Sequence, residues 1–260
     1  MAKEKIRLGG MALPNGVLVH GPHAWACAIR HDDGRIEVAS ARKRLQAARI
    51  QNPVLRGPAR LAEALLLLPQ IKAKLPSARL PMESPRTVAS MLGAAVFVRG
   101  LRESGLRPVA RELLTAIASV APAVLALRSG ELAAYHGAEH ISIGSYEHGK
   151  RATREHERCG GHLVGPLVAT SAIGNFLAGL APERMRRHAQ AAAQLGALAA
   201  ATELFGWMTR HPSHPLAQAL AKPGHELQHR FSTAEPSAEQ LEVAEAALKA
   251  CLALEHEAAA

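Results

Sequence analysis

The feature that most constrains the fold is a series of apolar runs that fills the chain from residue 59 onward, with proline, glycine and arginine at their boundaries. The runs consist mostly of Ala, Leu and Val, while aromatic residues make up only 3% of the 260-residue chain. Because Ala and Leu are among the strongest helix formers, we expect a mainly α-helical protein. The expected helices cover residues 59–75, 86–103, 108–127, 131–148, 161–181 and 189–209.

Two of these runs, residues 161–181 and 189–209, approach the length of about 20 apolar residues that crosses a bilayer. Both contain polar side chains, such as Asn175 and Glu203, and these are costly in lipid unless they face other protein. Composition therefore does not decide between a membrane-embedded helical bundle and a buried hairpin in a soluble helical domain.

Basic residues flank the first of these runs on both sides, at residues 150–158 and 184–187. A simple single crossing predicts an asymmetric distribution of charge. The Gly165–Pro166 pair instead favours a broken or re-entrant segment.

The N-terminal region has a different pattern. Over residues 9–40, short runs of Val, Ile and Trp alternate with turn residues, and Asp33–Gly34 is a strong hairpin signal. Residues 41–58 are basic and end in two helix breakers, Asn52–Pro53 and Gly57–Pro58. We therefore expect residues 1–58 to form a small β-hairpin subdomain with a basic linker, followed by a helical domain over residues 59–260.

The C-terminal segment predicts an amphipathic helix that docks on the rest of the protein. Ser237 and Gln240 have the spacing of a capping box. The residues that follow place Leu241, Ala244, Leu248 and Leu252 on one apolar stripe.

The net charge of +9 raises the question of a polyanionic partner. The basic residues form short groups between the apolar runs, without stacking aromatic residues or a recognisable nucleic-acid-binding module. We therefore expect no nucleic-acid partner, and membrane lipids fit the charge better. Three cysteines at unrelated spacings predict no disulfide framework and favour a reducing compartment.

The segment "YHGAEH" places His136, Glu139 and His140 on one face of the helix expected at 131–148. Two imidazoles at i and i+4 can bind one metal ion. Gly149 is well placed to end this helix, because glycine readily adopts the left-handed conformation of a C-cap. In the inverted H-x-x-E-H arrangement of metalloenzymes, the histidines bind zinc and the glutamate activates water. The alternative is that these groups are packing or surface residues.

The next segment, "HERCGGH", supplies the remaining candidate ligands, His156 and Cys159. Histidine and cysteine are the usual ligands of zinc. Either residue would complete a site with His136 and His140, while Tyr135 and Glu147 are candidates for orienting the imidazoles.

Several separated motifs resemble the YqhQ-like bacterial family. They are the glycine-rich opening, "AYHGAEH", "HERCGG" and the closing "FSTAEPSAEQLEVAEAALKA". The similarity covers about residues 9–252. It implies a multi-pass membrane protein of an uncharacterised family that is described as a metal-dependent enzyme, and it favours His136, Glu139, His140, His156 and Cys159. Family members commonly have lysine where this chain has Ile141.

These observations lead to three functional hypotheses. The first is a membrane-embedded zinc hydrolase that acts on a peptide or lipid-linked substrate, with Glu139 as the general base. The second is a non-catalytic integral membrane protein, in which a structural metal site supports docking of a protein partner. The third is a soluble helical binding protein. The first two predict multi-pass insertion in the inner membrane with cytoplasmic basic loops, and the third predicts the cytoplasm.

Overall fold

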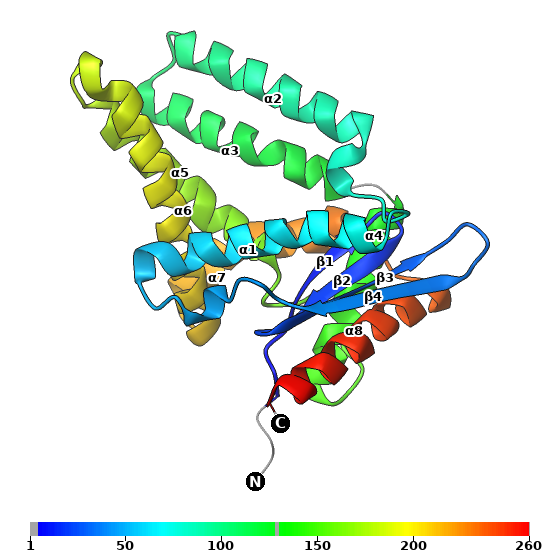
Figure 1. Ribbon diagram of the computed structural model, residues 1–260. Coiled ribbons are helices and arrows are strands. Elements are labelled where there is room, and N and C mark those ends of the chain that lie inside the picture. The colour runs from blue at the N-terminus through cyan, green and yellow to red at the C-terminus, as the bar shows by residue number, and fades with distance from the viewer. Residues whose placement is uncertain (1–4, 128–129, 260) are drawn as a thin grey trace.

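The computed structural model describes residues 5–127 and 130–259. Its N-terminal part is an antiparallel sheet in the order β1-β2-β3-β4 (Figure 1). The strands are β1 (Gly9–Leu13), β2 (Gly16–His20), β3 (Ala24–Arg30) and β4 (Ile36–Arg42). The hairpin predicted at Asp33–Gly34 is confirmed as the β3–β4 turn, with Gly34 at φ +86°. The region is larger than a single hairpin, because all four strands pair in sequence.

Eight α-helices follow the sheet along the described part of the chain. They are α1 (Pro53–Lys74), α2 (Pro85–Glu103), α3 (Pro108–Leu127), α4 (Gly130–His148), α5 (Val164–Gly179), α6 (Arg186–Arg210), α7 (Pro215–Leu227) and α8 (Ala238–Ala259). The prediction of a mainly helical protein is confirmed. The sequence reasoning missed α7, and it began the first helix at residue 59 rather than at Pro53. That helix begins earlier because the Asn52 side chain accepts a hydrogen bond from the Val54 amide and caps it.

The two faces of the sheet pack against different helices, because side chains alternate along each strand. Leu18, Trp25 and Ile29 pack against α1, whereas Val17, Val19 and Ala28 pack against α4 and α8. The sheet therefore lies between α1 and the C-terminal helix, as Figure 1 shows. The division at residue 58 stays a prediction.

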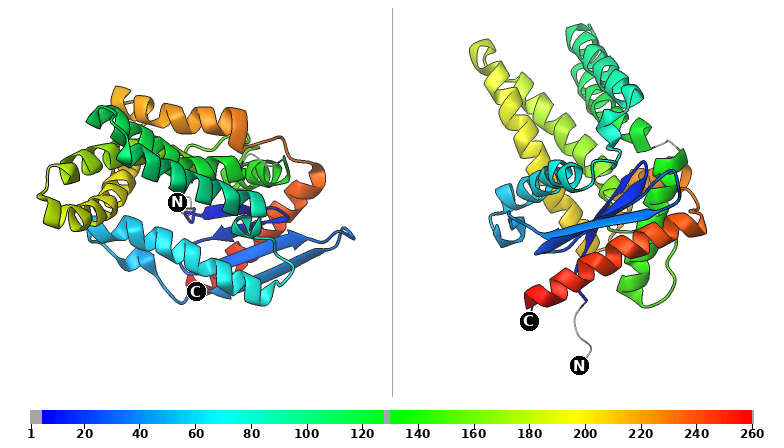
Figure 2. Two further views of the ribbon diagram at one scale, coloured as in Figure 1. Left: turned by 90° about the horizontal axis from the view of Figure 1, so that it is seen from above. Right: turned by 45° about the vertical axis from the view of Figure 1, so that its right-hand side comes forward.

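Two helical hairpins, α2–α3 and α5–α6, project from the same side of the sheet (Figure 2). Helices α3 and α5 contact each other and join the two hairpins. Helix α6 also contacts α1, so the two hairpins form a helical part of the molecule beside the sheet.

Among the described residues, only α3 is long and apolar enough to be a candidate membrane span, judged by length and composition. The predicted spans at 161–181 and 189–209 do not qualify. Helix α5 has 16 residues, fewer than the roughly 20 that a bilayer requires, and α6 begins with Arg186, Arg187 and His188. The composition of the described helices therefore does not support a membrane-embedded bundle.

The predicted break at Gly165–Pro166 is also wrong. Helix α5 begins at Val164, so both residues lie in its first turn. Proline is tolerated there because its missing N–H would have no intrahelical acceptor.

The C-terminal helix α8 confirms one detail of its prediction and corrects another. Ser237 and Gln240 form the capping box: the Ser237 hydroxyl accepts from the Gln240 amide at 3.3 Å, and the Gln240 side chain accepts from the Ser237 amide at 2.9 Å. The fully buried stripe is Val243, Ala244, Ala247 and Cys251, so the prediction is confirmed at Ala244, while the predicted Leu248 is only half-buried. Small side chains on this stripe let α8 lie close to the sheet.

Candidate metal centre

Helix α4 carries the candidate site in the interior of the protein. Every residue from Leu132 to Gly144 is buried. Tyr135 and Ala138 pack into the core with β2, β3 and α8, and the adjacent face presents His136, Glu139 and His140 to a cavity. The predicted helix and its end are confirmed, with Gly149 in the left-handed region at φ +70°.

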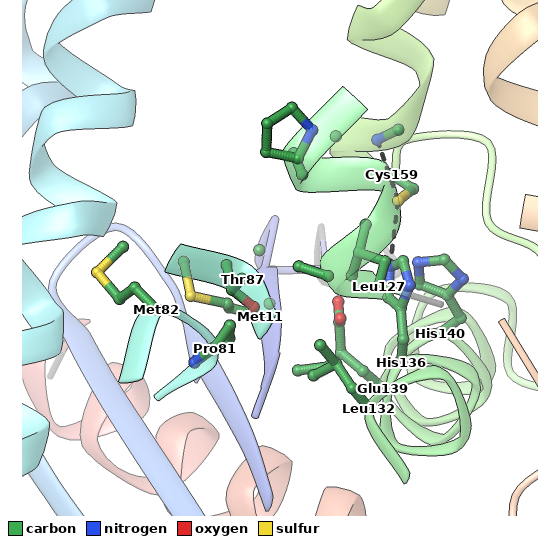
Figure 3. Close-up of a pocket in the computed structure, with 18 of the residues that line it drawn as sticks. Met11, Pro81, Met82, Thr87, Leu127, Leu132, His136, Glu139, His140 and Cys159 are labelled. Atoms are coloured by element: carbon green, nitrogen blue, oxygen red, sulfur yellow. Dashed lines mark hydrogen bonds between the residues drawn. The ribbon is translucent and has the colours of Figure 1, made fainter. Parts of the chain in front are cut away.

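His136, His140 and Cys159 form a compact group in which one potential ligand atom from each residue lies within 4.8 Å of the others. The Cys159 sulfur is 3.4 Å from Nε2 of His136, and the centroids of the two imidazole rings are 4.3 Å apart. Figure 3 shows the thiol of Cys159 facing the two imidazoles. The loop after α4 thus brings a sulfur atom to the two imidazoles of the helix.

Backbone carbonyls determine which imidazole nitrogen is available in each histidine. Nδ1 of His136 donates to the carbonyl of Ser232 at 2.7 Å, and Nδ1 of His140 donates to the carbonyl of Arg154 at 2.7 Å. Burial lowers the pKa of both imidazoles, so each ring is neutral. A carbonyl oxygen can only accept, so both Nδ1 atoms carry protons and both Nε2 atoms are unprotonated. Nε2 of His136 can accept a hydrogen bond from the Cys159 thiol. Metal-binding histidines are commonly oriented by this type of hydrogen bond.

The segment that contains Ser232 reaches His136 because Gly137 has no side chain. A Cβ atom at Gly137 would collide with the carbonyl oxygen of Ala234. The Ala234 amide donates to the carbonyl of Ala133 at 2.9 Å, which holds this segment against α4. Glycine within the motif therefore permits the close approach that orients the first histidine.

His156 lies beside the compact group but has a different partner. Its ring centroid is 5.6 Å from that of His140, and its Nε2 is 3.0 Å from a carboxylate oxygen of Glu147. Glu147 also accepts a hydrogen bond from Arg158. The structure thus brings Cys159 to the two helical histidines, and it places His156 with Glu147 at the edge of the group.

Glu139 is 6% exposed, and its carboxylate accepts no hydrogen bond from the described residues. Burial raises the pKa of this carboxyl to about 8. The side chain fits against the edge strand only because residue 10 is glycine, since a Cβ there would overlap the carboxylate. Figure 3 shows Glu139 pointing into the cavity next to His136.

The cavity has a volume of about 840 Å³. One end is formed by the polar groups of α4 and the 156–161 loop, and the remaining walls come from β1, α2, α3 and the segment before α2. Met11, Met82 and Leu127 are among the apolar side chains of these walls (Figure 3). The His136, His140 and Cys159 group is therefore accessible to a ligand that fills an apolar chamber.

Sequence reasoning missed several parts of this site. The orienting groups are the carbonyls of Ser232 and Arg154, whereas the predicted orienting residue Tyr135 packs in the core. His20 of β2 also lines the cavity. Backbone carbonyls have no sequence signature, and glycines such as Gly10 and Gly137 were the local signals of a close approach.

The fold and the site together define a mainly helical protein with an N-terminal antiparallel sheet and a buried His-His-Cys group on its central helix. The chain belongs to the family described as Protein of unknown function (DUF1385), whose model matches residues 112–254. No curated protein and no solved structure matches the chain. The match confirms the expectation of an uncharacterised family. The matched region includes Glu139 and the group of His136, His140 and Cys159, whereas β1 and α2 lie outside the matched region.

Proposed function

We propose that the protein is a zinc-dependent hydrolase that acts at the inner membrane, with His136, His140 and Cys159 as the metal ligands and Glu139 as the general base. The observation that carries this proposal is the convergence of two unprotonated Nε2 atoms and one thiol beside a buried carboxylate that faces a large cavity.

The geometry of the ligand atoms fits zinc. Two ligands on a tetrahedral zinc ion, one nitrogen and one sulfur, are separated by about 3.5 Å when the usual bond lengths apply. The distance from His136 Nε2 to the Cys159 sulfur is 3.4 Å. Three protein ligands leave one coordination position, which is the arrangement of catalytic rather than structural zinc sites.

A bound zinc ion would polarise a carbonyl or phosphoryl oxygen and lower the pKa of a water molecule toward neutrality. The role of Glu139 is to accept a proton from the attacking water and to transfer it to the leaving group. A neighbouring dication favours the ionised carboxylate and opposes the effect of burial, so Glu139 would be a base in the loaded protein. His156 and Glu147 hold the 154–159 loop that carries the sulfur ligand.

Membrane association is supported by the outer surfaces of the two helical hairpins. Val96 on α2 is 72% exposed and Val109 on α3 is 70% exposed, and they lie among other exposed apolar side chains. Soluble monomers seldom expose contiguous apolar patches of this kind. The most apolar window of α3 is only 17% buried, so this helix is not a core helix of the folded chain. Arginines near the tips of the hairpins, such as Arg107 and Arg186, suit contact with anionic lipid headgroups.

Metal content of the purified protein tests the ligand assignment. Elemental analysis of the wild type should give one zinc per chain, and Glu139→Gln should retain it. His136→Ala and His140→Ala should lose most of the metal, while His188→Ala, on the exposed start of α6, serves as the control and should retain it. Wild-type protein without stoichiometric metal, or a His140→Ala variant that keeps its zinc, would refute the assignment.

Cobalt substitution distinguishes the hydrolase from a protein with a closed structural site. Cobalt bound by a cysteine and two histidines gives visible bands that report the coordination shell. Addition of acetohydroxamate should change these bands if a coordination position is open. An unchanged spectrum at saturating hydroxamate would support the alternative of a structural site that serves partner docking.

A further inference from the structure

We infer that the cavity beside the metal-binding group is a binding site for a long hydrocarbon chain, so that the substrate is an amphiphile with its hydrolysable group at Glu139 and its chain between α2 and α3. This inference rests on the proposed function and specifies its substrate class.

One end of the cavity is lined by polar side chains and the rest is mainly apolar. Its polar end carries Glu139, His136, His140 and Cys159, whereas α2 and α3 contribute Met91, Val98 and several alanines. The volume of about 840 Å³ lies within the range of roughly 300–1,000 Å³ typical of small-molecule sites. A ligand that fills the cavity must therefore combine one polar reactive group with a large apolar part.

The same walls argue against a peptide as the substrate. Helices α2 and α3 offer the side-chain hydroxyls of Thr87 and Ser119, and the Ser119 hydroxyl already donates to the carbonyl of Thr115 at 2.8 Å. A peptide in this chamber would bury amide groups without enough partners, and each unsatisfied group costs free energy. A hydrocarbon chain has no such groups.

The position of the cavity also provides a route for an apolar chain. Met91 lines the cavity and is 53% exposed, so the chamber opens beside α2. Leu92 and Val96, on the same helix, are exposed outside the cavity. A chain that leaves a bilayer at this helix reaches the metal-binding group along apolar surface throughout, without crossing water.

Photolabelling of the full-length protein in lipid nanodiscs tests the inference. The probe is a palmitate analogue with a diazirine near the chain end, and the nanodiscs contain phosphatidylcholine and phosphatidylglycerol. Mass spectrometry should locate the label on cavity residues of the apolar walls, such as Met91 on α2. A butyrate analogue with the same reactive group should label these residues far less, because its chain does not extend along the walls.

A matched pair of variants on α2 separates the cavity from the outer surface. Ala95 lines the cavity and Ala89 does not, although both are exposed on this helix. Ala95→Trp should reduce labelling of the cavity residues by roughly tenfold or more through overpacking, and Ala89→Trp should not. If Ala95→Trp fails to fold, as judged by circular dichroism, Ala126→Leu on α3 replaces it. Equal labelling of the cavity variant and Ala89→Trp, or label confined to the outward residues such as Val96, would overturn the inference.

Zinc content measured on the same samples separates this inference from the proposed function. His140→Ala should lose zinc and still bind the long-chain probe, because the apolar walls remain. Labelling of the cavity in a wild-type protein that binds no zinc would refute the hydrolase and leave the chain site standing. Stoichiometric zinc without cavity labelling would support the metal site and overturn the inference of a hydrocarbon-chain site.

Discussion

At the scale of single residues, the histidines that line the cavity differ in the partners of their ring nitrogens. His136 and His140 donate from Nδ1 to carbonyls, which leaves Nε2 of each ring unprotonated. His20 has the opposite arrangement. Its Nδ1 lies 3.1 Å from the ammonium of Lys43, which can only donate, so Nδ1 accepts a hydrogen bond from Lys43. Lys43 is held in turn by Glu63 at 2.7 Å, in a buried ion pair. His20 is therefore neutral with its proton on Nε2, which makes it a hydrogen-bond donor rather than a metal ligand.

The environment of His20 predicts an acid sensitivity of the fold. Desolvation by burial, with the charge of Lys43, lowers the pKa of His20 from 6.5 to about 4. The unfolded chain therefore binds more protons than the folded chain between pH 6.5 and pH 4, and stability is lost as pH falls through this window. This single group should cost at most about 2 kcal/mol between pH 7 and pH 5.

His20→Asn tests this effect because its side-chain oxygen can still accept from Lys43 but does not titrate. The free energy of unfolding, measured by chemical denaturation at pH 7 and pH 5, should fall less for the variant than for the wild type. The same loss in both proteins would show that His20 does not contribute.

At the scale of elements, α4 and α8 illustrate two uses of small residues on helices that pack closely. Gly137 lets the 232–234 segment reach the imidazole of His136. Ala247 and Cys251 let α8 lie on the sheet. In α8, Leu241 and Leu248 pack only partly buried against this core, which explains why the predicted stripe located the buried face at Ala244 but not at its leucines.

Substitutions in α8 can distinguish its cap from its packing. Ser237→Ala should destabilise the protein by about 1 kcal/mol, since it removes the hydroxyl that accepts from the Gln240 amide. Val243→Asp should cost at least about 3 kcal/mol because Val243 is fully buried. Leu248→Asp should cost less, because Leu248 is half-buried. Thermal unfolding of the three variants gives the order, and a larger loss for Leu248→Asp than for Val243→Asp would contradict the packing described here.

At the scale of the whole molecule, the polar site and the apolar surfaces occupy different parts of one architecture. The sheet, α4 and α8 form a closed core, and the α2–α3 and α5–α6 hairpins extend from it with exposed apolar side chains (Figure 2). The candidate metal centre lies between these parts, where the cavity walls change from α4 to α2 and α3. An amphiphilic substrate would meet both parts at this position.

This arrangement predicts that the protein stays with membranes when peripheral proteins are removed. Carbonate at alkaline pH should leave most of it in the membrane fraction, and detergent should release it, because apolar rather than ionic contacts would hold the hairpins in lipid. Immunoblots of the two fractions measure the distribution. Double replacement of Val96 and Phe97 by serine should shift protein to the carbonate extract, while release of the wild type itself would show that the hairpins do not insert.

The amino-acid sequence by itself determined the features that depend on neighbours along the chain. The helical class, the β3–β4 turn, the capping box at Ser237 and the shared face of His136, Glu139 and His140 follow from periodicity and local hydrogen bonding. The tertiary structure alone decided how these parts form a site. It placed Cys159 rather than His156 next to the helical histidines, and it set the tautomer of His136 through the carbonyl of Ser232, 96 residues away. These outcomes rest on contacts between distant segments, whose free energies depend on the packed positions of backbone groups that local sequence patterns do not encode.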